Sequence, residues 1–164
     1  MSNRPRALTG FVGFSKGDSV GTSPWILVDQ DMISAFGAVT RDPDPMHIDP
    51  EWARRHSRYG ETIAFGFLTV SLLTHMLHGA MGTDPARNTG VSGDYLNYGM
   101  DYLRLISPVR VGSRIRGKFD VLETRTDDKD RTIVKFGCEI EIEGGERPAL
   151  VAHWLSIWVP HDHD

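Results

Sequence analysis

The sequence predicts an α+β protein in which a curved antiparallel sheet covers one buried helix. Residues 65–81 are apolar on nearly every side, as in a helix that keeps no face for water. Residues 95–159 change to an alternation of apolar and polar side chains, the spacing of strands that bury one face. Short polar or glycine-rich turns separate these strands, so they are expected to follow one another as a meander beside the helix.

The N-terminal 40 residues are expected to begin with little regular structure and to continue with a short strand and a helix. Residues 1–24 are rich in glycine, serine and proline and predict a loosely ordered lead-in or a strip laid over the core. Residues 24–28 predict a short strand. Asp29 is suited to cap the N-terminus of the helix that follows, because its carboxylate can accept from an unpaired backbone N–H. That helix is expected to turn four apolar side chains inward: Met32, Ile33, Phe36 and Val39.

Prolines and glycines set the limits of the next elements. Pro43 and Pro45 predict a loop, because proline lacks an N–H and disfavours helix in the residue before it. Asp49 followed by a proline is a good helix start, so residues 50–57 are expected to form a brief helix. Gly60 marks the exit from it, ahead of the long apolar helix.

The second half of the chain predicts long strands. Residues 95–106 form the first strand, and their apolar set changes phase near Tyr102, which suggests a bulge. The clearest half-buried strand presents five residues to one face: Val134, Phe136, Cys138, Ile140 and Ile142. Residues 127–130 predict a polar turn ahead of it. Residues 150–159 are apolar on both faces, which predicts a central strand or one at a subunit interface.

Composition narrows the class of protein. A chain of 164 residues fits one domain spanning 1–164, with residues 160–164 as a frayed tail. The net charge of −4 argues against nucleic acid as a partner. Polar residues interrupt the longest apolar stretch, so no membrane span is expected. No apolar signal core follows the N-terminal arginines, and the single Cys138 forms no internal disulfide, so the expected location is cytoplasmic.

An acid and an imidazole precede the apolar helix in a pattern that suits proton transfer. The run DPDPMH at 42–47 holds Asp42 and His47 close together. The helix that begins near Gly66 offers backbone N–H groups to a developing anion, so the combination is a workable catalytic site. Plainer interpretations stay open on the residues alone. Asp42 would then complete a turn, His47 would be exposed, and Gly66 would only permit close packing.

Several stretches resemble one family. TRDPDPMHID at 40–49 resembles the D-x-N-P-x-H-x-D motif of the MaoC-like dehydratases, the (R)-specific enoyl-CoA hydratases. GETIAFGFLT at 60–69 resembles the G-x-x-I-A-H-G-x-L-T segment of that family. Three later runs resemble its nodulation-protein-N-like branch: NYGMD at 97–101, SPV and VGS within 107–113, and EIEG and RPA within 141–149. Together they span most of residues 25–159.

The resemblance implies a hot-dog fold, in which an antiparallel sheet wraps a long central helix, and a homodimer. It also implies addition of water to a trans-2-enoyl thioester of CoA or acyl carrier protein, giving the (R)-3-hydroxyacyl thioester. Asp42 and His47 become the catalytic pair, Gly66 binds the thioester carbonyl through its N–H, and Thr74 lines the site with its hydroxyl. Thr74 also has the plainer interpretation of a satisfied buried hydroxyl. No metal or redox cofactor is required.

Two positions depart from the family pattern. Asp44 replaces the asparagine of the first motif and adds a carboxylate near Asp42. If both were buried, one of the two would titrate at a raised pKa. Phe65 replaces the histidine before the glycine and is expected to change the pocket wall and the acyl preference. Phosphates of CoA would be met by arginines at the mouth of the tunnel, with three candidates: Arg104, Arg110 and Arg114.

Two other functions compete with hydration. An acyl-CoA thioesterase uses the same fold, but it normally places an acid on the central helix, and residues 65–77 contain no Asp or Glu. A non-catalytic subunit that binds acyl thioesters is the third hypothesis. The changes at Asp44 and Phe65 support it, and the intact Asp42 and His47 pair argues against it.

Overall fold

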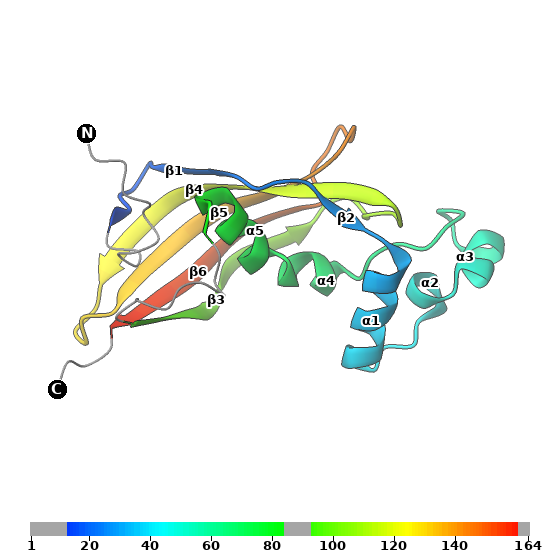
Figure 1. The fold of residues 1–164 in the computed structure, drawn as a ribbon, viewed down its shortest axis with the longest axis horizontal. Coiled ribbons are helices and arrows are strands. Elements are labelled where there is room, and N and C mark those ends of the chain that lie inside the picture. Colours follow the sequence, from blue (N-terminus) through cyan, green and yellow to red (C-terminus); the bar gives the residue numbers. More distant parts are fainter. Residues whose placement is uncertain (1–12, 84–92, 161–164) are drawn as a thin grey trace.

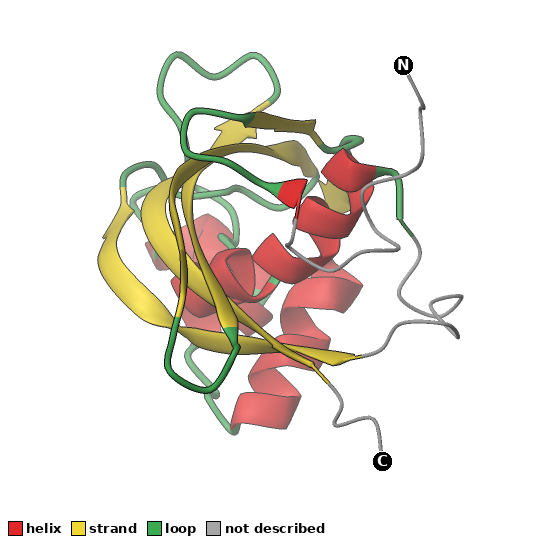
Figure 2. Cartoon of the chain, turned by 90° about the vertical axis from the view of Figure 1, so that its left-hand side faces the viewer, coloured by secondary structure: helices red, strands yellow, loops and turns green. Residues whose placement is uncertain are grey.

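The computed structural model describes residues 13–83 and 93–160, and in this part of the chain one antiparallel sheet curls around two consecutive helices (Figures 1 and 2). The strands are β1 (Ser19–Thr22), β2 (Ile26–Val28), β3 (Gly93–Leu105), β4 (Ser113–Thr126), β5 (Thr132–Ile142) and β6 (Leu150–Pro160). Their order is β1-β4-β5-β6-β3, and β2 pairs with β4 as well. Every pairing is antiparallel, which confirms the predicted meander.

The helices divide into two groups. They are α1 (Gln30–Thr40), α2 (Pro45–Ile48), α3 (Pro50–His56), α4 (Gly66–Ser71) and α5 (Leu73–Met81). Helices α4 and α5 lie against the concave face of the sheet, whereas α1, α2 and α3 gather at one end of it, on the right in Figure 1. None of the helices in the described part of the chain has the length and apolar character needed to cross a membrane.

The central helix is broken, which the sequence did not predict. Leu72 lies between the two helices, as the C-cap residue of α4 and the N-cap residue of α5. Just before it, the hydroxyl of Ser71 donates to the carbonyl of Phe67 at 2.7 Å, one turn back along the helix. Such hydroxyl bonds compete with the backbone ladder and bend helices. The expectation of burial all round was also wrong on one side, because Phe67 is 71% exposed and Thr74 is exposed.

The core lies between α5 and the sheet. Its largest fully buried side chains come mainly from the concave face of the sheet and from α5: Phe119, Phe136, Ile115, Ile140, Leu150, Leu73 and Met76. At Gly117 the two layers approach closely, since a Cβ there would lie 3.0 Å from Cβ of Met76 and 2.7 Å from the ring of Phe119. Glycine is therefore the residue that lets β4 pass under the helix.

Helix α1 forms as predicted, and three of the four side chains expected inside, Met32, Ile33 and Phe36, pack against the core. Asp29 caps it by accepting from the N–H of Met32 at 2.9 Å. Val39, expected inside, is 84% exposed, and the fully buried positions are Ile33 and Gly37. A Cβ at Gly37 would lie 2.9 Å from Ile48 and 3.1 Å from the ring of Phe65. The close packing of α2 against this glycine sets the inner face.

The proline-punctuated loop contains a single turn of helix. In α2, Pro45 occupies the first turn, and Asp44 caps it by accepting from the N–H of Met46 at 2.9 Å. Asp49 then caps α3 in the same way, accepting from the N–H of Trp52 at 2.9 Å, as the sequence predicted. The second proline, expected to stop the preceding helix, therefore starts a new one, whereas α1 ends earlier, at Thr40.

The sheet agrees with the sequence in most details. β3 contains two bulges, one of them between Met100 and Tyr102, where the phase change predicted it. β6 lies between β5 and β3, which explains its two apolar faces. Residues 19–22, expected to be part of a lead-in or strip, form β1 along the edge of β4. Residues 1–12 of that lead-in and 161–164 of the predicted tail lie outside the described residues.

Candidate active site

The imidazole of His47 is anchored at one nitrogen. His47 lies in α2, is half-buried, and places Nδ1 2.7 Å from the carbonyl oxygen of Ile63. A carbonyl oxygen only accepts, so Nδ1 carries the proton and the neutral ring keeps the lone pair on Nε2. That tautomer leaves Nε2 as the basic atom, a role that suits proton abstraction.

Phe65 covers one face of the same imidazole. The two ring centroids are 3.9 Å apart and the ring planes are tilted by 32°. Phe65 is only 5% exposed and packs on its other side against Phe36, at 5.4 Å between centroids. The orientation of the imidazole is therefore fixed by a hydrogen bond in its plane and by an aromatic ring against its face.

His47 and Gly66 line one hollow of the surface, here called the His47 hollow. Its lining residues are His47, Tyr59, Ile63, Ala64, Gly66, Thr69, Leu105, Ile106, Ser107, Pro108, Val109 and Ala149. Gly66 is the first residue of α4, where backbone N–H groups have no partner within the helix. A Cβ on Gly66 would lie 2.2 Å from Cδ1 of Leu105, so glycine is the residue that lets the Leu105 side chain pack this closely against the start of α4.

Asp42 is held in a turn by its own backbone. Arg41, with φ of 58°, ends α1 in the left-handed conformation, and the N–H of Asp42 donates to the carbonyl of Gly37 at 3.0 Å. The carboxylate is exposed and accepts from the N–H of Asp44 at 3.2 Å. Asp42 is thus tied into a turn, and it is not among the residues that line the His47 hollow.

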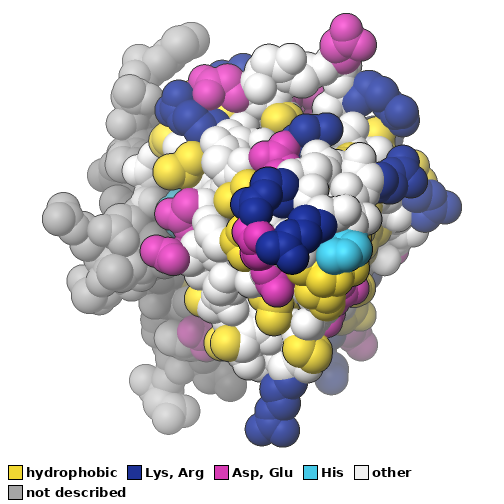
Figure 3. Space-filling view, turned by 90° about the vertical axis from the view of Figure 1, so that its right-hand side faces the viewer, with side chains coloured by type: hydrophobic (Ala, Val, Ile, Leu, Met, Phe, Trp, Pro, Cys, Tyr) yellow, Lys and Arg dark blue, Asp and Glu magenta, His cyan; other side chains and the backbone are white. Residues whose placement is uncertain are grey.

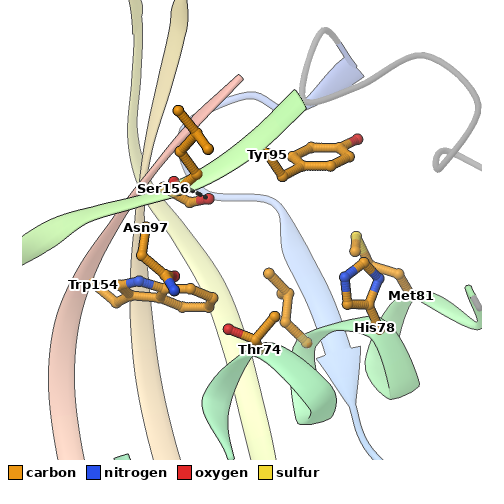
Figure 4. A pocket seen from close by; sticks show the side chains of 9 residues that line it. Thr74, His78, Met81, Tyr95, Asn97, Trp154 and Ser156 are labelled. Carbon is orange, nitrogen blue, oxygen red and sulfur yellow. Dashed lines mark hydrogen bonds between the residues drawn. The ribbon is translucent and has the colours of Figure 1, made fainter. Parts of the chain in front are cut away.

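Thr74 lies at a different hollow, between α5 and the strands β3 and β6 (Figure 4). This Thr74 hollow is lined by Thr74, Leu77, His78, Met81, Tyr95, Leu96, Asn97, Trp154 and Ser156. Figure 4 shows the Asn97 amide and the Thr74 hydroxyl on opposite walls, with the Trp154 indole beside them. Burial raises the pKa of the Tyr95 phenol to about 12, because the apolar surroundings disfavour the charged form.

The site predicted from the sequence is therefore brought together in part. His47 and Gly66 share one hollow, Asp42 stands in the turn that leads to α2, and Thr74 belongs to the second hollow. The hydrogen bond from the N–H of Asp44 to the Asp42 carboxylate agrees with the plainer interpretation, in which Asp42 completes a turn. The plainer interpretation of His47 does not apply, since its ring is half-buried and hydrogen-bonded.

Comparisons with known proteins bear on this arrangement. The sequence profile of the MaoC like domain matches residues 13–141. The chain is 40% identical to nodulation protein N of Rhizobium leguminosarum bv. viciae over 141 residues, which is 86% of this chain and 84% of that protein. This chain belongs to the MaoC-like family of dehydratases.

Other members of the MaoC-like family extend the comparison. The 3-hydroxyacyl-thioester dehydratase Z of Mycobacterium tuberculosis (strain ATCC 25618 / H37Rv) is 31% identical over 143 residues, 87% of this chain and 90% of that protein. The (R)-hydratase from A. caviae involved in PHA biosynthesis superposes with a TM-score of 0.68 at 21% identity, covering 88% and 96% of the two chains. The MaoC-like dehydratase from Rhodospirillum rubrum gives 0.69 at 24% identity, over 92% and 96%. These superpositions establish the hot-dog fold.

Each departure from the MaoC-like motif has a structural role. Asp44 caps α2 and is exposed, so its carboxylate is not buried beside Asp42. Phe65 fills the space between His47 and Phe36. Neither residue replaces His47 or Gly66, which both line the His47 hollow.

The three arginines considered for phosphate already have partners within the chain. Arg110 pairs with Glu61 at 2.8 Å and Arg114 with Glu143 at 3.1 Å. Arg104 donates to the carbonyl of Leu103 at 2.8 Å. Figure 3 shows basic and acidic side chains mixed on the end formed by α1, α2 and α3, so this face presents no field of one sign.

Residues that the sequence did not single out also shape this MaoC-like site. Gln30 of α1 donates to the carbonyl of His47, and Thr62 donates to Gln30. Tyr59 lines the His47 hollow. Thr62 lies inside the second family motif, which was a usable signal, whereas nothing in the spacing of α1 distinguishes Gln30 from a solvated helix residue.

Proposed function

We propose that this protein adds water to a trans-2-enoyl thioester and releases the (R)-3-hydroxyacyl thioester, or catalyses the reverse dehydration. The observation that carries the proposal is the anchored imidazole. Nδ1 of His47 is committed to the carbonyl of Ile63, and Gly66 lines the same hollow. Nε2 is thereby left as the basic atom, next to a backbone donor for the thioester oxygen.

The proposed reaction uses one water molecule and balances without a cofactor. Nε2 of His47 takes a proton from the water, and the hydroxide forms a bond to C3 of the substrate. The electrons of the double bond move to the thioester oxygen, which accepts a hydrogen bond from the Gly66 N–H. C2 then receives the proton held on Nε2 of His47, on the same face, as the electrons return from the thioester oxygen and its C=O bond re-forms. Proton transfer by a positioned group is worth about 10²–10⁴-fold, and one oxyanion donor about 10²–10³-fold.

Asp42 is proposed to hold the water from its other side. Its carboxylate would leave the N–H of Asp44 to do so. That exposed bond is 3.2 Å long, so breaking it costs about 1 kcal/mol. The turn after α1 holds the backbone of Asp42 through the carbonyl of Gly37.

A thioesterase is the second candidate function, and the central helix argues against it. Residues 66–81, which contain α4 and α5, include no Asp or Glu, so no carboxylate from this helix is available to attack a thioester or activate water. The non-catalytic alternative predicts binding without turnover.

One assay separates the three functions. The protein is incubated with crotonyl-CoA and with a longer enoyl-CoA, while enoyl absorbance and free thiol are followed together. Loss of absorbance without thiol supports hydration, thiol release supports hydrolysis, and tight binding with neither supports the non-catalytic subunit. Chiral chromatography of the product identifies the configuration at C3. The same assay with an acyl carrier protein thioester shows whether the protein prefers CoA or acyl carrier protein as the carrier of the acyl group.

Variants tie the activity to the site. Asp42→Ala and His47→Ala are each expected to remove most turnover while circular dichroism shows a folded protein. Asp44→Asn is the matched control, because asparagine also caps helices and is the residue of the family motif. Undiminished turnover in either alanine variant would refute the assignment.

We also propose that the protein is a homodimer that joins along β3. In the described residues β3 ends the sheet and pairs only with β6, so its other edge is open. Four large side chains on it are exposed: Leu96 at 51%, Tyr98 at 56%, Tyr102 at 39% and Leu105 at 51%. A long, open, apolar edge favours pairing with a second strand. Light scattering of the wild type should report twice the monomer mass, and Leu96→Lys should lower that mass. A wild-type mass equal to the monomer would exclude the dimer.

A further inference from the structure

We propose that Gln30 and Thr62 are positioning residues. Together they form a hydrogen-bonded bridge that fixes the position of the His47 imidazole relative to the backbone of Gly66. This inference rests on the proposed function, since it concerns how the proposed base is held. The bridge joins three parts of the chain: α1, α2 and the segment that leads into α4.

The bridge consists of two consecutive hydrogen bonds. The hydroxyl of Thr62 donates to Oε1 of Gln30 at 2.5 Å, and Nε2 of Gln30 donates to the backbone carbonyl of His47 at 2.9 Å. A primary amide is suited to this position because it accepts at one atom and donates at the other. Thr62 is 1% exposed, and a hydroxyl buried to that extent is costly to leave unpaired.

Two further contacts close the bridge into a ring. The N–H of Ile63 donates to the carbonyl of Met46 at 3.4 Å, and Nδ1 of His47 donates to the carbonyl of Ile63 at 2.7 Å. The main chain and the side chain of His47 are therefore both tied to residues 62 and 63. Since Gly66 begins α4 just after this segment, the ring relates the imidazole to the proposed oxyanion donor.

The segment that receives these bonds is itself fixed to the strand side of the protein. The carbonyl of Thr62 accepts from the N–H of Val111 at 3.0 Å, and the N–H of Ala64 donates to the carbonyl of Val109 at 2.7 Å. By contrast α2 is four residues long, and a helix that short has little stability of its own. The bridge thus fastens a weak element to a rigid one.

Loss of the bridge should therefore reduce turnover more than binding. The imidazole would keep its chemistry but lose its direction, and a misplacement of about 1 Å can cost about 10²-fold in rate. Substrate affinity depends on the hollow as a whole, of which His47 is one wall among many.

The test compares four variants of the full chain in the hydration assay. Thr62→Val removes the hydroxyl at nearly constant shape, and Thr62→Ser restores it. Gln30→Glu keeps the acceptor for Thr62 but removes the donor to His47. Ser34→Ala is the matched control, because Nε2 of Gln30 also contacts the Ser34 hydroxyl, at 3.1 Å, outside the bridge. We expect kcat to fall about tenfold or more in Thr62→Val and Gln30→Glu with KM within about threefold, and Thr62→Ser and Ser34→Ala to stay within about twofold of wild type.

A second measurement follows the imidazole directly. In nitrogen-15 spectra of the neutral ring, His47 should carry its proton on Nδ1 in the wild type and show a mixture of tautomers in Thr62→Val and Gln30→Glu. The His47 signal is assigned by its absence from His47→Ala. This readout does not depend on turnover, so it still decides the role of the bridge if wild-type protein hydrates no enoyl thioester and the proposed function fails.

Three outcomes would overturn the inference. The first is an unchanged kcat and tautomer in both Thr62→Val and Gln30→Glu. The second is Thr62→Ser impaired as much as Thr62→Val, which would make packing, not the hydroxyl, the cause. The third is a rise in KM at constant kcat. If Gln30→Glu does not fold, the Thr62 pair decides alone.

Discussion

The contact between Phe65 and His47 predicts a measurable coupling between the two side chains. Phe65→Leu removes an aromatic ring that is 5% exposed and that contacts two rings, His47 at 3.9 Å and Phe36 at 5.4 Å. Each aromatic pair is worth about 0.5–1.5 kcal/mol beyond its buried area, so the single substitution should lower the free energy of unfolding by about 1–3 kcal/mol.

A double-mutant cycle separates the two contacts. Phe65→Leu, His47→Leu and the double variant should give a coupling energy of about 0.5–1.5 kcal/mol. His47→Leu also leaves the carbonyl of Ile63 without its partner, but that loss occurs with and without Phe65 and cancels in the cycle. The expected coupling therefore reports the ring contact alone.

Urea unfolding followed by tryptophan fluorescence measures each corner, since the chain has four tryptophans. The protein concentration is kept constant, because association adds to apparent stability. Tyr102→Leu combined with His47→Leu serves as the control and should be additive, since Tyr102 contacts His153 on the sheet. A Phe65–His47 coupling below about 0.3 kcal/mol would refute the idea that the ring of Phe65 fixes the imidazole.

Three further predictions concern the hollow, the core and the β4–β5 turn. Gly66→Ala should lower turnover by about 10²-fold, because the new methyl displaces the side chain of Leu105, which lines the His47 hollow. Adding Leu105→Ala should restore turnover, and no recovery would contradict this reason. Burial raises the pKa of the Cys138 thiol from 9.0 to about 12, so the unfolded chain loses this proton first and the free energy of unfolding should fall by about 1.4 kcal/mol per pH unit above pH 9. In denaturant titrations Cys138→Ala should show a shallower fall, and an unchanged slope would contradict the burial of the thiol. A hydrogen bond from Arg131 lowers the pKa of Asp127 from 3.8 to about 2, so the stability it contributes is present above pH 3.8 and is lost as the pH falls through 2. In thermal melts, Asp127→Asn should reduce the fall of Tm between about pH 4 and pH 2. An identical fall in the variant and the wild type would exclude the contribution of Asp127.

Much of the fold was predictable because local signals and tertiary packing agree. The alternation of Val134 to Ile142 reappears as the buried face of β5, and the caps at Asp29 and Asp49 form as predicted. Three of the four predicted inner residues of α1 pack on the core, but the burial of Gly37 was not predictable, because it depends on how closely α2 approaches it. The sequence of α1 shows that Val39 is apolar but not that its neighbours leave it in water.

The candidate site divides in the same way. His47 and Gly66 were found in the sequence because each lies in a run that resembles a motif of the MaoC-like family. Gln30 was not, since its partners Thr62 and His47 come from two other parts of the chain. A hydrogen-bond bridge between distant segments leaves no periodic trace, so only coordinates reveal it.

The two departures from the family motif bear on whether the protein is an enzyme. The proposed donor at Gly66 is a backbone N–H, which any residue at position 65 leaves in place. Phe65 adds an apolar ring that covers one face of His47 and keeps water from it. Asp44 keeps the helix-capping function that asparagine would have, at an exposed position where a second carboxylate costs little. A subunit that only binds acyl thioesters would gain nothing from an imidazole whose Nδ1 is fixed to Ile63 and whose Nε2 keeps its lone pair, so the arrangement favours the proposed catalysis.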